Sequence, residues 1–480
     1  MKKLALALVP FLFASSVLAN PATPEGADHL AQVFQTYLGA GAAVISVVAH
    51  GDVYDLTLNV QSLIALGQDA GLTGTVTPIA LHLGDNGDGT WAVALDQPIS
   101  IDLSMPKSVD IKEEIASLSF VGTFDEALMG FTKSTSTFSG MTLVETIYPP
   151  ESTPPQTVQA SVESGTLDST GAAAAAGGMD FSATLTSHGL SETMTTPAME
   201  GEPAMPITLK ADSLSETLSG NQFMGAEMLQ LAAWLVAHPD PASKEADQAG
   251  LKAIFLAAMP FFGNLQANGK VSMLSVDTPM GAVGVQDMGF WLDMNGAVAQ
   301  GKFREGFRIS GVTLPAGLVP DWAAPLVPQS MTLDVQVTDF DLAAAVTAAL
   351  SALDAPLATA TGPEFDAKLQ AALLPKGTVT ITLNPGALSG AGYGLTYEGA
   401  MVLGPDMEAP TGTATVTLTG ADALRAVLNA APDDMKAEAM MGFGMAQGMA
   451  KAEGDKLIWQ IDAPTPGALS INGMALMGGK

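Results

Sequence analysis

The sequence predicts an α+β fold rich in β-structure, in which long curved antiparallel sheets carry helices packed on one side of an elongated body. Along most of the chain, short runs alternate apolar residues with threonine, serine or charged residues, as half-buried strands do. The 50 glycines and 30 prolines punctuate these runs. Helical periodicity is confined to separate segments between the strands. With 48% hydrophobic and 14% charged residues, the chain can bury a sizeable core.

The first 19 residues have the three parts of a secretory signal peptide. Lys2 and Lys3 give the positive start, residues 4–13 are apolar, and small residues lead to Ala19 and Asn20. A spanning helix needs about 20 apolar residues, which is more than this run supplies. We expect cleavage between Ala19 and Asn20 and release into the periplasm of a Gram-negative bacterium. An uncleaved anchor is the alternative.

Charge and cysteine content exclude several classes of function. Removing residues 1–19 deletes two lysines and no acid, which leaves 17 basic and 49 acidic residues and a net charge of −32. Binding to nucleic acid or to anionic lipid head groups requires clustered lysine and arginine, so we expect neither. The chain has no cysteine, which excludes disulfides, thiol chemistry and cysteine-held metals. We expect no cofactor and no membrane span in the mature chain.

The N-terminal half is expected to span residues 20–265. Thr23 and Pro24 have the pattern of a helix start, and apolar residues follow on one face up to Gly39. Residues 44–48 and 54–60 predict a hairpin, as do the strands that flank the Gly/Asp/Asn cluster at 85–89. That cluster lacks the ligand spacing of a calcium loop. A strand meander follows, and the half ends in a helical hairpin at 226–262.

The C-terminal half is expected to span residues 266–480 and to alternate strands with inserted helices. Strands are predicted up to 314, at 331–337, 379–383, 395–403 and 413–418. Helices are predicted at 342–353, 364–374, 422–429 and 433–451.

The helical hairpin at 226–262 is the candidate wall of an apolar ligand groove. The alternative is that its apolar face is ordinary core that covers a sheet. The side chains available for either role are Trp234, Leu235, Ile254, Phe255, Met259 and Phe262.

Methionines crowd the C-terminal fifth of the chain. Met441, Met445 and Met449 fall at i, i+4 and i+8 of the last predicted helix, and thioethers ligate Cu(I). The same spacing is typical of a helix buried against a sheet, and we favour that interpretation over a metal site.

No catalytic constellation is evident. The five histidines are far apart, no Gly-x-Ser-x-Gly motif occurs, and Gly263–Lys270 departs from the phosphate-loop spacing. We therefore expect a protein that is not an enzyme.

The layout and the ending Ala468-Leu469-Ser470-Ile471-Asn472-Gly473 resemble the domain-of-unknown-function family 2125 of alphaproteobacterial envelope proteins. More distantly, they are similar to AsmA- and YdgA-type periplasmic proteins. The resemblance implies a curved sheet with helices on one side and a role in envelope maintenance or lipid handling. It supplies no catalytic residues.

Three functions remain open from the sequence. The first is a periplasmic protein, not an enzyme, that binds a lipid or other apolar ligand. The second is a structural or protein-interaction protein of the envelope. The third is a methionine-rich copper-binding protein.

Overall fold

The structure is a computed structural model that describes residues 21–38, 44–61, 64, 71–149, 154–196, 205–354, 362–404 and 410–477. The predicted signal peptide and its cleavage site at Ala19 and Asn20 lie outside these residues. The chain forms two compact units, residues 1–263 (unit 1) and 264–480 (unit 2), and each is described by itself. None of the described helices combines the length and the apolar character needed to cross a bilayer.

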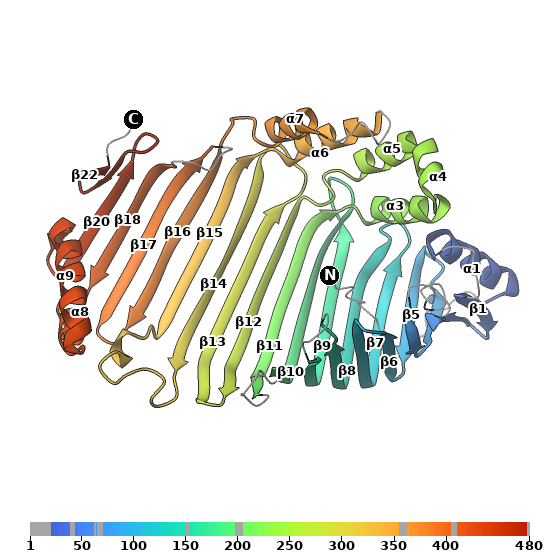
Figure 1. Cartoon of the computed structure of the whole chain (residues 1–480). Coiled ribbons are helices and arrows are strands. Elements are labelled where there is room, and N and C mark those ends of the chain that lie inside the picture. Colours follow the sequence, from blue (N-terminus) through green and yellow to red (C-terminus); the bar gives the residue numbers. More distant parts are fainter. Residues whose placement is uncertain are drawn as a thin grey trace. The chain divides into compact units, whose positions relative to one another are not determined.

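Unit 1 is built on antiparallel strands that lie side by side in an open sheet (Figure 1). Its short strands are β1 (Ile45–His50), β2 (Val53–Leu58), β3 (Thr73–Val76), β4 (Ile79–Asp85), β5 (Thr90–Asp96) and β6 (Ile99–Met105). Its long strands are β7 (Val109–Asp125), β8 (Gly130–Ile147), β9 (Gln156–Ala173), β10 (Met179–Thr196) and β11 (Met205–Phe223). Its described helices are α1 (Pro24–Leu38), α3 (Gly225–Ala237), α4 (Pro241–Ala246) and α5 (Gln248–Ala258). The predicted helix at 24–38, both hairpins and the helical hairpin are confirmed.

Helix α1 covers one end of this sheet and creates the core of unit 1. The Thr23 hydroxyl accepts a hydrogen bond from the Gly26 N–H and caps the helix. Gly26 lies against the Tyr54 ring, where a Cβ atom would clash. The helix contacts β1, and its Ala27 belongs to a cluster with alternate apolar residues of β2, β4, β5 and β7, among which Leu56, Leu95 and Phe120 are almost fully buried. Burial of this one face explains why these strands alternate in sequence.

The long strands of unit 1 share a kink. Gly140 on β8 and Gly189 on β10 have φ near +64° in mid-strand. The register aligns them with Ala116 on β7 and Glu163 on β9, and regular pairing is interrupted at this row. Along β7 and β8 the alternation of exposed residues shifts by one residue here. The shift keeps apolar side chains on one face of the sheet on both sides of the kink.

Unit 2 is likewise built on antiparallel strands that lie side by side (Figure 1). The strands are β12 (Asn264–Thr278), β13 (Gly281–Asn295), β14 (Gly301–Thr313), β15 (Ser330–Phe340), β16 (Val379–Gly390), β17 (Tyr393–Leu403), β18 (Thr411–Thr419), β19 (Lys451–Glu453), β20 (Lys456–Ala463), β21 (Leu469–Ile471) and β22 (Met474–Met477). The described helices are α6 (Leu342–Leu350), α7 (Pro363–Leu373), α8 (Ala421–Asn429) and α9 (Asp433–Met449), with short 3-10 turns η2 (Ala324–Leu326) and η3 (Ser351–Asp354). The strands and helices predicted for this half are confirmed.

The same kind of kink crosses β12 to β14. Met273 and Gly311 have φ of 52° and 67°, and both face Gln286 in the register. The apolar residues of β12 change phase here as well, from Leu274 to Val271.

The Asn472-Gly473 motif forms the tight turn between β21 and β22. Both residues have positive φ, as a two-residue hairpin of this kind requires. The Asn472 amide also donates hydrogen bonds to the backbone oxygens of Met449 and Ile458, each at 2.8 Å. The motif therefore ties the last hairpin to the end of α9 and to β20.

Candidate functional site: an apolar sheet face

One face of the unit 2 sheet consists almost entirely of apolar side chains. The register places eight of them in a continuous row across eight strands. They are Val271, Met288, Ile309, Met331, Leu388, Leu395, Leu418 and Leu457. Side chains two residues along each strand share this face. We call this surface the apolar face of unit 2.

The next row on this face alternates aromatic and aliphatic side chains with glycine. Gly269 pairs with Phe290, which pairs with Phe307 and then Leu333. Further along, Gly386 pairs with Tyr397, and Val416 with Trp459. A Cβ atom at Gly269 or Gly386 would lie within 2.3 Å of the facing ring. The two glycines thus let the rings lie flat on the sheet.

None of the described helices of unit 2 covers the middle of the apolar face. Among the described residues, helices make no extensive contact with β12 to β16, and Figure 1 shows these strands without a helical layer. Met288, Phe290, Phe307, Met331 and Leu333 are only half-buried, although they lie in central strands. Full burial appears at Leu418 and Leu457, towards α8 and α9. The middle of the face is therefore open.

The open part of the face is comparable to the largest apolar patch on a soluble protein. Over β12 to β16, five strands spaced about 4.8 Å apart and four rows of side chains cover about 19 Å by about 20 Å, or about 400 Å². The largest apolar patch on a soluble monomer is ordinarily about 300–600 Å² and is often functional.

The opposite face of the same strands carries charged and polar side chains, several of which pair with one another. Arg304 donates to both carboxylate oxygens of Asp334, and Asn384 donates to the same group at 2.7 Å. Asp334 is buried, and its pKa is lowered, first by the hydrogen bond from Arg304. Lys270 pairs with Asp287 at 2.6 Å. The two faces therefore differ sharply in the ligands they can take.

The polar atoms on the apolar face mostly have partners. The Tyr397 hydroxyl donates to the Thr332 carbonyl at 2.6 Å, and burial raises the pKa of Tyr397. Trp459 Nε1 donates to the Ala446 carbonyl of α9 at 2.8 Å. Glu305 on β14 is the exception, because this exposed carboxylate has no partner among the described residues. Apolar contact is consequently what this face offers.

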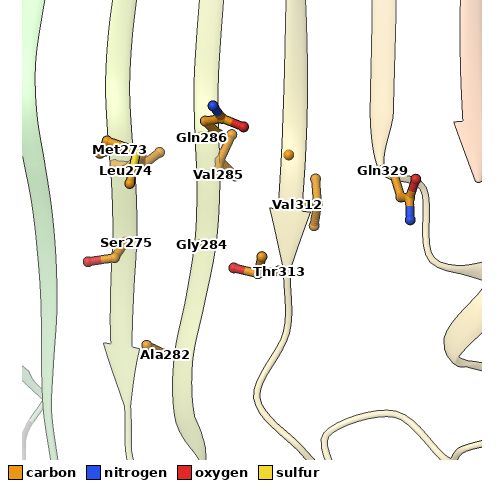
Figure 2. A pocket seen from close by; sticks show the side chains of 11 residues that line it. Met273, Leu274, Ser275, Ala282, Gly284, Val285, Gln286, Val312, Thr313 and Gln329 are labelled. Carbon is orange, nitrogen blue, oxygen red and sulfur yellow. The ribbon is translucent and has the colours of Figure 1, made fainter.

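A shallow pocket of about 660 Å³ lies where the kink crosses β12 to β14 (Figure 2). It is lined by Met273, Leu274, Ser275, Ala282, Gly284, Val285, Gln286, Gly311, Val312, Thr313 and Gln329. Figure 2 shows Ser275 and Thr313 on the strands flanking Gly284, which contributes no side chain. No titratable group lines the pocket, so it provides no acid, base or anionic ligand for catalysis.

The groove residues expected on the helical hairpin differ in their exposure to solvent. Trp234 is 7% exposed. Its indole donates to Asp247 at 2.8 Å and stacks on His238 with ring centroids 4.3 Å apart. The Trp234 hydrogen bond is the main cause of the lowered pKa of Asp247. Trp234 therefore holds α3 to the start of α5.

The other groove residues are more accessible. Leu235 is 48% exposed, and Ile254, Phe255, Met259 and Phe262 are half-buried. Phe255 makes an edge contact with Phe261. These side chains leave some apolar surface on the hairpin.

The prediction that Met441, Met445 and Met449 form a buried core stripe is wrong for two of the three. Met441 and Met445 are 63% and 62% exposed, and only Met449 is half-buried. Helix α9 instead packs through Phe443, Ala446 and Gln447, which lie on the side of the helix opposite to Met441 and Met445. Spacing places residues on one face but does not say which face is buried.

Histidines that are distant in sequence meet on one carboxylate in unit 1. His82 Nδ1 lies 2.6 Å from one oxygen of Asp55, and His50 Nδ1 lies 3.3 Å from the other. All three side chains are more than one-third exposed. In the described part of the chain, no group of three or more histidine, aspartate or glutamate side chains is arranged to hold a metal ion.

Sequence reasoning did not identify the apolar face of unit 2, although its signal was present. On β15, Met331, Leu333, Val335 and Val337 alternate strictly with polar residues. Alternation predicts one apolar face, but it does not reveal that the face lacks a cover. No protein-family model matches the chain, and neither the curated proteins nor the solved structures contain a match.

Proposed function

We propose that this protein binds a lipid or another apolar ligand on the apolar face of unit 2 and is not an enzyme. The observation that carries the proposal is the open apolar surface of about 400 Å² over β12 to β16, in the middle of a well-paired sheet. Burying apolar surface stabilises a complex by about 25 cal/mol per Å², so the face is a strong site for hydrocarbon.

The chemistry of the face favours hydrocarbon over a polypeptide partner. Strands β13 to β17 are paired on both sides, so their backbone groups are unavailable for strand addition. A protein interface ordinarily forms about one hydrogen bond per 100–200 Å². The apolar face has Tyr397 and Trp459 already engaged, which leaves few groups for that purpose. Acyl chains need none.

The cellular setting is part of the same proposal. We infer export by the signal peptide at 1–19 and a role in envelope maintenance in the periplasm, in line with the resemblance to family 2125. A sheet with helices on one side would suit a carrier of this kind, and the hairpin at 226–262 is a separate candidate wall within unit 1. Sequencing the N-terminus of the mature protein tests the export step, and we expect it to start at Asn20.

Two neighbouring positions on β15 test the binding site. Leu333→Asp puts a charge on the apolar face, whereas Thr332→Asp puts the same charge on the polar face. We expect Leu333→Asp to weaken binding of an apolar fluorescent probe at least tenfold, since burial of one leucine is worth about 1.5–3 kcal/mol. Thr332→Asp should bind as the unaltered protein does. Mass spectra of the native protein should also show co-purified lipid.

Two outcomes would contradict the proposal. One is equal probe binding by both variants, with circular dichroism showing both folded. The other is a ligand-free native mass spectrum together with a stable envelope partner captured by crosslinking, which would favour the structural or interaction role.

Copper binding is a second candidate, favoured by the exposure of Met441 and Met445 on α9. Their thioethers lie one helical turn apart on the solvent side, and Cu(I) prefers such ligands. Titration of the reduced protein with Cu(I) tests this. A Met441→Leu/Met445→Leu variant should lose binding, and Met288→Leu/Met331→Leu on the apolar face should keep it. No uptake by the unaltered protein would dismiss the candidate.

A further inference from the structure

Charges are distributed unequally between the two faces of the long strands. Within β7–β11 and β12–β18, the lysines and arginines all lie on the polar faces; they are Lys112, Lys133, Lys210, Lys270, Lys302, Arg304 and Arg308. Five glutamates lie instead in rows with apolar side chains; they are Glu113, Glu145, Glu192 and Glu216 in unit 1 and Glu305 in unit 2. The charged side chains that lie in apolar rows of these strands are therefore acidic.

Glu305 is the carboxylate that belongs to the proposed binding face. It pairs with Leu292 on β13 and Val335 on β15, and Phe303 and Phe307 are its same-face neighbours along β14. It is exposed and has no hydrogen-bond or ion-pair partner among the described residues. Water can solvate it while the face is empty.

A ligand that covers the face changes the surroundings of Glu305. Hydrocarbon over Phe307 and Leu333 removes water from the neighbouring carboxylate, and an ion without water needs an opposite charge or a donor. The nearest basic residues along the strand, Arg304 and Arg308, lie on the other face, and Arg304 is engaged by Asp334. The compensating group must then come from the ligand. An anionic ligand would add repulsion, in a chain whose net charge is already −30.

We propose, on the basis of the proposed function, that the ligand is a long-chain amphiphile with an ammonium group, whose hydrocarbon covers the apolar face of unit 2 while the ammonium group pairs with Glu305. Glu305 then selects the head group, and the rows of side chains that include Phe307 and Met331 bind the hydrocarbon chain of the ligand. Free fatty acids and other anionic amphiphiles are the disfavoured class.

Three amphiphiles with the same twelve-carbon chain test this assignment. Dodecyltrimethylammonium, dodecyl maltoside and dodecanoate are titrated into the full mature chain by calorimetry, below their micelle thresholds. We expect the ammonium compound to bind most tightly and dodecanoate most weakly. Glu305→Gln should weaken ammonium binding about threefold, as expected for one exposed ion pair, and leave dodecyl maltoside unchanged. Glu398→Gln removes the same charge from the polar face of unit 2 and should change neither.

The outcomes separate this assignment from the proposed function. If the three amphiphiles bind equally, or if Glu398→Gln weakens ammonium binding as much as Glu305→Gln does, the head-group assignment is overturned and hydrocarbon binding stands. If none of the three binds to protein that circular dichroism shows to be folded, the proposed function itself fails.

Discussion

Two regions of the molecule use the same sheet chemistry with opposite results. Under α1 in unit 1, alternate apolar residues of β2, β4, β5 and β7 form a sealed core, and Leu95 is completely buried. On β12 to β16 in unit 2, the side chains of an equally regular apolar face are only half-buried. Apolar residues of α1 join the cluster in unit 1, whereas Figure 1 shows no helical layer over β12 to β16. Apolar side chains of this pattern therefore stabilise the core of unit 1, whereas in unit 2 they remain available for binding.

The comparison also indicates which interactions stabilise unit 2. Its open face gains only partial burial, whereas its polar face carries the buried Asp334 with Arg304 and Asn384. Hydrogen bonds to buried charged groups contribute more than those between neutral groups. The buried hydrogen bonds of Asp334 therefore contribute to the stability of unit 2 from its polar face.

The largest expected effect contrasts two leucines. Leu95→Ala should cost about 3–4 kcal/mol in the unfolding free energy of unit 1, because it opens a cavity in a sealed core. Leu333→Ala on the open face should cost about 1 kcal/mol or less in unit 2, since water already reaches the site. Hydrogen exchange of β5 and β15, followed by mass spectrometry, measures the two units separately. Equal costs would mean that Leu333 is covered in solution.

The second prediction concerns the polar face of unit 2. Asp334→Asn removes the carboxylate that receives Arg304 and Asn384, and we expect a loss of about 2–3 kcal/mol at neutral pH. The matched control is Asp287→Asn, whose exposed pair with Lys270 should contribute less than about 1 kcal/mol. Chemical denaturation monitored by hydrogen exchange in β15 distinguishes them. A smaller loss for Asp334→Asn than for Asp287→Asn would contradict this account of the polar face.

The pKa of Asp334 adds a pH dependence to the same test. The folded state lowers the pKa below the usual 3.8, chiefly through the hydrogen bond from Arg304. This stabilisation is therefore fully present above the unfolded pKa and is lost as pH falls through the folded one. The unaltered protein should lose stability below about pH 4, and its advantage over Asp334→Asn should shrink there. If the difference in unfolding free energy between the unaltered protein and Asp334→Asn stayed constant down to low pH, the charge of Asp334 would not be its cause.

The smallest effect concerns the kink of unit 2. Gly311 has φ of 67°, and a Cβ atom there would lie 2.5 Å from the Cβ of Gln286. Gly311→Ala should cost about 2 kcal/mol, which combines backbone strain of about 1 kcal/mol with displacement of Gln286. Gly317→Ala has the same sign of φ and open space around it, so it should cost about 1 kcal/mol. Equal melting temperatures for the two variants would contradict a special role for Gly311 in the kink.

The kink illustrates how a pattern in the sequence needs a register to be interpreted. Leu274 and Val271 are three residues apart, as are Leu118 and Ile115, which breaks the strict alternation of apolar residues. In one strand, such a break looks like an irregularity. Only the alignment of Gly140, Ala116 and their neighbours across strands shows a shared kink that keeps the apolar side chains together.

The sequence by itself determined the strands, the helices and the existence of apolar faces, because periodicity, caps and turn residues act locally. The helix at 24–38, the alternation on β15 and the turn at Asn472-Gly473 follow from neighbouring residues alone. Only the tertiary structure decided which faces are covered, since coverage depends on segments distant in sequence. For that reason the tertiary structure exposes Met441 and Met445 and buries Trp234 against Asp247. It also leaves Glu305 on an open apolar face without a partner among the described residues.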